Sequence, residues 1–130
     1  MTEAAATSIS VLLVEDNDVY RESLVFLLRR VDGIEVVGAV ADGTAAVPAC
    51  LELTPTVVVL DYRLPDIDGA EVAAELRKRC PAAAIVFLSA SASAGEYDAA
   101  AGAGAALVRK DEGVDALVSA VRAAARRGQE

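Results

Sequence analysis

The sequence predicts an α/β domain in which five parallel strands alternate with five helices. Short apolar runs recur along the chain, and segments with helical spacing of apolar residues separate them. Connections of this length are typical of a parallel sheet with helices on both faces. With 130 residues, 55% of them hydrophobic, the chain is long enough for one domain with a sizeable core.

The first strand is expected over Ile9–Val14, a short and almost wholly apolar run. Asn17 or Asp18 can cap the helix that follows, because a short polar side chain accepts a hydrogen bond from a free backbone N–H of the first turn. We expect this helix to end at Asp32 and Gly33. Its apolar positions are Tyr20, Leu24, Leu27, Leu28 and Val31.

A second strand is predicted over Ile34–Val40, and a second helix over Thr44–Leu53. Pro48 lies within that helix, and because proline is tolerated only in a first turn, we expect the helix to be short or bent. The run Val57–Leu60 then predicts a third strand. Its lack of alternation indicates a strand buried on both faces.

The third helix is expected to begin near Gly69 and to be closed by Pro81. Ile85–Leu88 predicts a fourth strand. The next segment, Ser91–Gly102, is rich in Ala and Gly, and its only large apolar side chain is Tyr97. If it is a helix, it buries little surface and should be the most loosely held one.

Ala105–Val108 predicts the fifth strand, and Asp111 is expected to cap the last helix. We expect residues 1–8 to be a disordered leader, residues 9–127 the folded domain, and residues 128–130 a tail or the start of a linker. The last helix is lined by Val114, Leu117, Val118 and Val121.

Composition excludes several classes of function. The net charge of -8 argues against nucleic-acid binding by this domain alone, and no apolar run is long enough to cross a membrane. Cys50 and Cys80 are expected to be free, buried thiols of a cytoplasmic protein. The chain contains no histidine, which excludes a Ser-His-Asp triad or a histidine-based zinc site within it.

Polar side chains follow four of the predicted strands at the points where those strands end. Glu15 and Asp16 follow the first strand, Asp61 the third, Ser89 the fourth and Lys110 the fifth. Since the carboxyl ends of parallel strands lie on one edge of the sheet, we expect these side chains to converge there.

Each residue type in this group has a chemical use. Clustered carboxylates repel one another unless a cation joins them, and Mg²⁺ prefers oxygen ligands. A carboxylate can also act as a nucleophile and form an aspartyl phosphate. A lysine ammonium can stabilise a phosphoryl group in transfer, and a hydroxyl can donate to a phosphoryl oxygen.

With these residues, the chain resembles the receiver domain of bacterial two-component response regulators, from Val11 to about Ala125. The resemblance rests on the Glu15-Asp16 pair, the Leu60-Asp61-x-x-Leu64-Pro65-x-x-x-Gly69 stretch, Ser89-Ala90 and Lys110. It implies a flavodoxin-like fold with strand order 2-1-3-4-5. The Lys110-Asp111 ending is similar to NarL/FixJ-type receivers, whose partners are usually LuxR-type DNA-binding domains.

The resemblance also implies roles for individual residues. Asp61 matches the phosphoacceptor. Glu15, Asp16 and the backbone carbonyl of Arg63 match the other protein contributions to a Mg²⁺ site. Lys110 matches the family's lysine.

Ser89 matches the switch hydroxyl of the family, and Ala90 the small residue beside the acceptor. The chain departs from the family pattern at two positions. Leu107 replaces the aromatic residue that often reports activation, and Asp111 replaces a proline that often follows the lysine.

The leading hypothesis is therefore a signalling switch rather than an enzyme. A partner histidine kinase would phosphorylate Asp61, and the altered surface would be presented to an output domain or partner. Regulation of transcription is the expected output. A homodimer is also possible in such a family. Two alternatives remain: a receiver that binds a partner without phosphorylation, and an aspartyl-nucleophile phosphatase. Against the phosphatase, Arg63 stands where such enzymes usually place a second acid.

Overall fold

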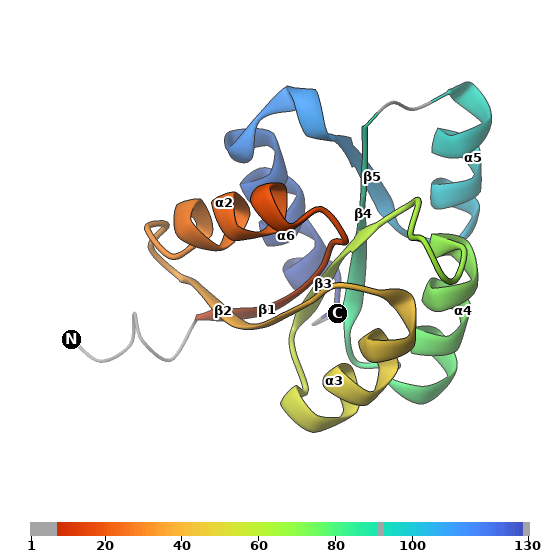
Figure 1. Cartoon of the computed structure of the whole chain (residues 1–130), viewed down its shortest axis with the longest axis horizontal. Coiled ribbons are helices and arrows are strands. Elements are labelled where there is room, and N and C mark those ends of the chain that lie inside the picture. Colours follow the sequence, from red (N-terminus) through yellow and green to blue (C-terminus); the bar gives the residue numbers. More distant parts are fainter. Residues whose placement is uncertain (1–7, 91–92, 129–130) are drawn as a thin grey trace.

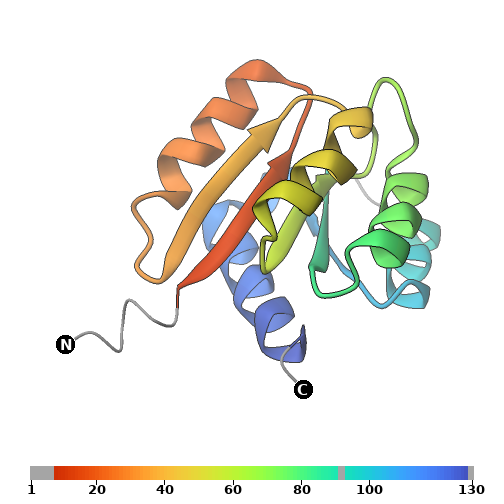
Figure 2. The ribbon, with the colours of Figure 1, turned by 90° about the horizontal axis from the view of Figure 1, so that it is seen from below.

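Five parallel strands form a single sheet in the computed structural model, which describes residues 8–90 and 93–128. The strand order is β2-β1-β3-β4-β5, as the resemblance implied, and Figures 1 and 2 show the twisted sheet between its helices. The strands are β1 (Ile9–Val14), β2 (Ile34–Val40), β3 (Val57–Asp61), β4 (Ala84–Ser89) and β5 (Ala106–Arg109).

Helices cover both faces of the sheet. Figure 1 shows α2 and α6 together on one side and α3, α4 and α5 on the other. No helix in the described part of the chain is both long and apolar enough to cross a lipid bilayer. The helices are α2 (Asp18–Leu28), α3 (Ala46–Leu53), α4 (Gly69–Arg79), α5 (Ala94–Gly102) and α6 (Val114–Gly128), with 3₁₀ turns η1 (Gly43–Ala45) and η2 (Lys110–Glu112).

The core has two parts, one on each face of the sheet, because successive side chains of a strand point to opposite faces. Leu13 and Val59 pack toward α2 and α6, whereas Leu12 and Val58 pack toward α3, α4 and α5. All four side chains are fully buried. The strand β3 therefore lies in the middle of the core, and the acid at its end is held on a rigid support.

Most predicted boundaries agree with the structure to within one or two residues. Asn17 caps α2, accepting a hydrogen bond from the Tyr20 N–H at 2.9 Å. Pro48 lies in the first turn of α3, because η1 forms a separate 3₁₀ turn before it, so the helix is short, as predicted. The predicted leader, apart from Ser8, lies outside the described residues.

One predicted cap is wrong. Asp111 does not cap the last helix, because it lies inside η2 and accepts a hydrogen bond from Arg109 Nε at 3.0 Å. The chain then turns at Gly113, whose φ of 92° suits glycine, and α6 begins at Val114. The sequence did not reveal this extra turn between Lys110 and the helix.

The two cysteines are free thiols, as predicted, although only Cys50 is fully buried and Cys80 is partly exposed.

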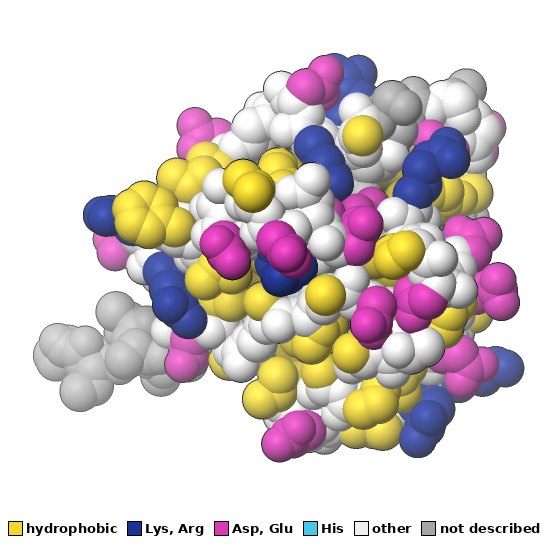
Figure 3. Space-filling model, in the orientation of Figure 1, with side chains coloured by type: hydrophobic (Ala, Val, Ile, Leu, Met, Phe, Trp, Pro, Cys, Tyr) yellow, Lys and Arg dark blue, Asp and Glu magenta, His cyan; other side chains and the backbone are white. Residues whose placement is uncertain are grey.

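Some large apolar side chains are exposed on the surface. Figure 3 shows hydrophobic side chains over α2, where Val19, Phe26 and Leu27 are exposed.

Candidate phosphoacceptor and metal site

Asp61 is placed by the strand that carries it. Residues 57–60 of β3 are fully buried, and the strand pairs with β1 on one side and β4 on the other. The pairing ends just beyond Asp61, where the Tyr62 N–H donates to the carbonyl oxygen of Leu88 at 2.9 Å. The acid therefore sits at the carboxyl edge of the central strand, where ligands bind in open parallel sheets.

Gly69 brings the start of α4 close to this strand end. A Cβ atom at this position would lie 2.5 Å from the Tyr62 carbonyl oxygen and 2.7 Å from that of Asp61. No side chain fits so close to two backbone oxygens, which explains the glycine. The Gly69 N–H donates to the Tyr62 carbonyl oxygen at 3.1 Å, which closes the loop that follows Asp61.

Glu15 and Asp16 come from the end of β1, next to β3. The Glu15 N–H donates to the carbonyl oxygen of Val40 at 3.0 Å, which extends the pairing of β1 with β2 by one residue. The Glu15 side chain points inward and is fully buried. Glu15 Oε2 accepts a hydrogen bond from the Asn17 N–H at 2.9 Å. Asp16 is exposed at the mouth of the site.

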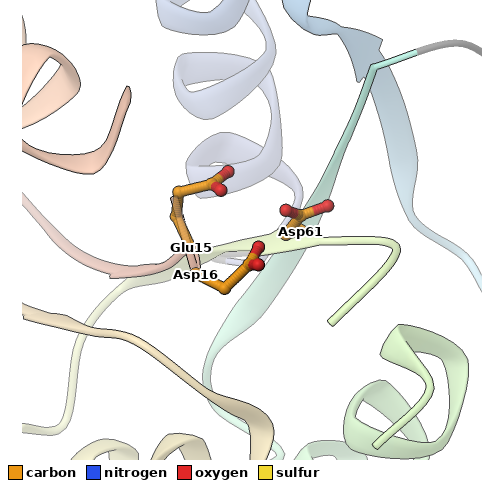
Figure 4. A group of neighbouring side chains, drawn as sticks. All are labelled: Glu15, Asp16 and Asp61. Atoms are coloured by element: carbon orange, nitrogen blue, oxygen red, sulfur yellow. The ribbon is translucent and has the colours of Figure 1, made fainter. Parts of the chain in front are cut away.

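The three acids meet as the sequence predicted. Figure 4 shows the carboxylates of Glu15, Asp16 and Asp61 turned toward a common space. One oxygen from each lies within 4.8 Å of the others, close enough to ligate one ion. Their oxygen-only donor set suits Mg²⁺.

Lys110 reaches the acids from the end of β5, the strand at one edge of the sheet. Its Nζ lies 2.8 Å from Glu15 Oε1 and 3.3 Å from Asp61 Oδ2. The contact with Asp61 has the geometry of a hydrogen bond, whereas that with Glu15 is an ion pair without it. Glu15 Oε1 is buried and has no hydrogen bond of regular geometry among the described residues, and the Lys110 ammonium beside it balances its charge.

Burial is the main cause of the unusual titration of Asp61. Burial, together with the nearby Glu15 charge, raises the pKa of this carboxyl to about 6. The Arg63 N–H, which donates to Asp61 Oδ1 at 3.1 Å, and the Lys110 ammonium oppose the rise. For Lys110, burial lowers the pKa, but its contacts with Glu15 and Asp61 outweigh burial and raise the pKa overall.

Ser89 lies at the same edge, as predicted. It is the last residue of β4, one position beyond Leu88, which is the register partner of Asp61, and it is buried. Leu107 lies on β5, opposite Phe87 of β4, and packs toward the core on the α5 side. The structure therefore places an aliphatic side chain at the position where the family resemblance implied an aromatic ring.

Sequence reasoning missed two contacts of the site. The Arg63 side chain forms an ion pair with Glu96 of α5 at 2.5 Å, and the Lys110 ammonium lies over the ring of Tyr20 at 4.6 Å from its centroid. Tyr20 was assigned only to the apolar side of α2. Neither contact has a sequence signal, because each joins residues that are distant along the chain.

The fold and the site together define a class: a parallel α/β domain with an acidic pocket and one ammonium at the carboxyl edge of its sheet. The model of the response regulator receiver domain matches residues 11–122. The chain therefore belongs to the family of response regulator receiver domains.

Solved structures of similar chains include two response regulators. A LuxR-family two-component response regulator from Aurantimonas sp. is 31% identical, with a TM-score of 0.86, over 92% of this chain and 86% of that one. The receiver domain of the putative response regulator NarL from Mycobacterium tuberculosis is also 31% identical, with a TM-score of 0.83, over 92% and 97%.

A curated relative has a different name. Protein-glutamate methylesterase/protein-glutamine glutaminase 6 from Anaeromyxobacter dehalogenans is 37% identical over 97 residues, which is 75% of this chain and 28% of that protein. The chain thus spans about a quarter of the length of this relative, whose remaining length lies outside the similarity.

Proposed function

We propose that this receiver domain accepts a phosphoryl group on Asp61 from the phosphohistidine of a partner kinase, in a Mg²⁺-dependent reaction. The observation that carries this proposal is the position of the Asp61 carboxylate, which has Lys110 Nζ at 3.3 Å and two further acids beside it. The chain has no histidine of its own, so the donor must be another protein or a small phosphodonor.

In the transfer, a carboxylate oxygen of Asp61 attacks phosphorus, the P–N bond of the donor breaks, and its electron pair returns to the imidazole. Lys110 neutralises charge on the phosphoryl oxygens as they approach. The Arg63 N–H holds Asp61 Oδ1 and so fixes the rotation of the carboxylate. No side chain needs to act as a base, because the nucleophile is already an anion once it has lost its proton.

Glu15, Asp16, Asp61 and the Arg63 carbonyl would hold the Mg²⁺. When bound, the ion supplies charge that screens the carboxylates from the incoming phosphoryl group. The converging carboxylates, one oxygen of each within 4.8 Å of the others, support this assignment.

Phosphorylation would then change the surface presented to a partner. A dianion on Asp61 attracts Lys110 and the Ser89 hydroxyl, and so pulls on the loops after β3 and β4. The Arg63–Glu96 ion pair already connects the first of these loops to α5. We infer that α5, β5 and α6 form the surface that changes.

The phosphorylation proposal has a direct test. Incubation with acetyl phosphate and Mg²⁺ should add one phosphoryl group to the wild-type protein and none to Asp61→Asn, as read by intact-mass spectrometry. Asp66→Asn is the matched control, because Asp66 lies in the same loop and its carboxylate accepts hydrogen bonds from the Gly43 and Thr44 N–H groups. Equal labelling of wild type and Asp61→Asn, or none of either, would exclude the proposal.

For the output, we propose regulation of transcription by a DNA-binding domain on the same protein. The similarity to NarL- and LuxR-type receivers over more than nine-tenths of the chain supports it. Reading the gene downstream of residue 130 tests the proposal. A helix-turn-helix domain is expected there, and a methylesterase domain would contradict it.

A further inference from the structure

Tyr20 places an aromatic ring against the Lys110 ammonium. The Nζ atom lies over the ring at 4.6 Å from its centroid, within the range at which the ring quadrupole attracts a cation. The same atom lies 2.8 Å from Glu15 Oε1 and 3.3 Å from Asp61 Oδ2. Two carboxylates and one neutral ring therefore surround this ammonium.

The ring is held in place by the first turn of α2. The Tyr20 N–H donates to Asn17 Oδ1 at 2.9 Å, which fixes the start of the helix. The next residue, Arg21, donates from Nη1 to the Glu15 carbonyl oxygen at 2.8 Å. Tyr20 is also half-buried and packs against the core on the α2 and α6 side. Its position is thus set by contacts independent of Lys110.

Lys110 needs such a neighbour because its other contacts have competing uses. A lysine ammonium is a point charge on a flexible four-carbon stem, and ordering it is costly. In the proposed function Glu15 also ligates a divalent cation, which weakens its ion pair with Lys110. An aromatic ring does not ligate Mg²⁺, so the ring keeps its attraction for the ammonium when the acids are engaged.

We propose that Tyr20 is a positioning residue, whose ring holds the Lys110 ammonium beside Asp61 when Glu15 is engaged by a cation. The effect on phosphoryl transfer rests on the proposed function. The position of the ammonium does not, and it can be measured in the protein without any phosphodonor.

The placement is tested by NMR. The chain has only two lysines, and Lys78 lies on the surface with its side chain 74% exposed, so it serves as an internal reference. In protein carrying ¹³C-lysine, the ring should shift the Lys110 ε-methylene protons upfield in wild type and Tyr20→Phe, with and without Mg²⁺. In Tyr20→Leu these protons should move to the position of Lys78. An unchanged Lys110 signal in Tyr20→Leu would overturn the proposal.

The consequence is tested by the rate of labelling with acetyl phosphate. Tyr20→Leu should react about three- to tenfold more slowly at unchanged Mg²⁺ affinity, and Tyr20→Phe within about twofold of wild type. Phe26→Leu is the matched control, because Phe26 lies later on the same helix and its exposed ring lies under the surface guanidinium of Arg30. That variant should leave both the Lys110 signal and the rate unchanged.

The outcomes separate this proposal from the proposed function. Amide spectra show whether each variant is folded, and Tyr20→Met replaces Tyr20→Leu if the latter is not. A displaced Lys110 signal with a wild-type rate, or a slower rate explained by weaker Mg²⁺ binding, would overturn the positioning role. If the wild type takes no phosphoryl group, the proposed function fails, and the lysine signals still decide where Tyr20 holds Lys110.

Discussion

At the scale of single residues, the site is an arrangement of charges that are costly to bury. Glu15 is fully buried and Asp61 nearly so, and Lys110 forms an ion pair with both. Two carboxylates beside one ammonium leave an excess negative charge in a poorly hydrated place. These buried charges therefore favour the binding of a cation more than they stabilise the unliganded fold.

This cost predicts a pH dependence for Asp61. Its pKa in the folded protein, about 6, lies above the ordinary 3.8, so the folded state binds more protons between these values. Stability from this group is present at low pH and is lost as the pH rises through about 6. In metal-free buffer, Asp61→Asn should therefore raise the melting temperature by a few degrees near pH 7.5. Near pH 4 the gain should be much smaller.

Thermal melts with a chelator across this pH range measure the effect. Lys110 keeps Glu15 as its partner in the variant, so loss of the acid leaves no isolated buried ammonium. Asp98→Asn, a change of an exposed acid on α5, should not alter the melting temperature in this pH-dependent way. An equal gain for Asp61→Asn at both pH values would contradict the buried-charge explanation.

At the scale of elements, the two helices that follow β3 and β4 are held very differently. α4 buries Val72, Ala73 and Leu76 in the core. Of the α5 side chains whose burial is described, only Ala100 is buried, as expected for this Ala- and Gly-rich segment. The Arg63–Glu96 ion pair and the Ser93 capping box hold its beginning. A helix with so little buried surface can shift at low cost.

The junction of β3 and α4 gives a prediction at this scale. Gly69→Ala should destabilise the protein by about 2 kcal/mol and slow labelling of Asp61, because the new Cβ would displace the backbone oxygens it meets. Gly102→Ala is the control, since a Cβ at that position meets nothing within 4 Å and favours the helix. Urea unfolding of both variants measures the difference. A Gly69→Ala variant as stable as Gly102→Ala would contradict this account.

At the scale of the whole molecule, the apolar core and the charged site occupy different parts of the fold. Two apolar layers enclose the sheet, and the charged groups of the site come from the ends of β1, β3 and β5 at one edge. The three acids are thus fixed by two neighbouring strands, β1 and β3, of one cooperative unit. Binding of a cation at this edge stabilises the folded chain as a whole, because the unfolded chain does not bring the acids together.

Mg²⁺ should therefore raise the melting temperature of the protein. At about 10 mM Mg²⁺ and neutral pH, we expect a rise of a few degrees for wild type, reversed by a chelator, and little or no rise for Asp16→Asn. Asp115→Asn, which changes an exposed acid in the first turn of α6, should respond like the wild type. The same rise in Asp16→Asn would place the ion elsewhere.

The order of the strands and helices along the chain, and most residues of the site, can be predicted from the sequence. Val57–Asp61 reads as a buried strand ending in an acid because unbroken apolar runs are tolerated only where both faces are covered. Because parallel strands end on one edge of a sheet, the sequence also predicts that Glu15, Asp16, Asp61 and Lys110 meet there. The strand order itself came from the family resemblance.

The tertiary structure alone decided what depends on distances between segments that are far apart along the chain. The ring of Tyr20 over Lys110 and the ion pair of Arg63 with Glu96 give no signal in the sequence, because each depends on how a helix packs against the sheet. The raised pKa of Asp61 likewise arises from burial by neighbours. Local spacing predicts which residues meet at an edge, and packing decides which atoms touch.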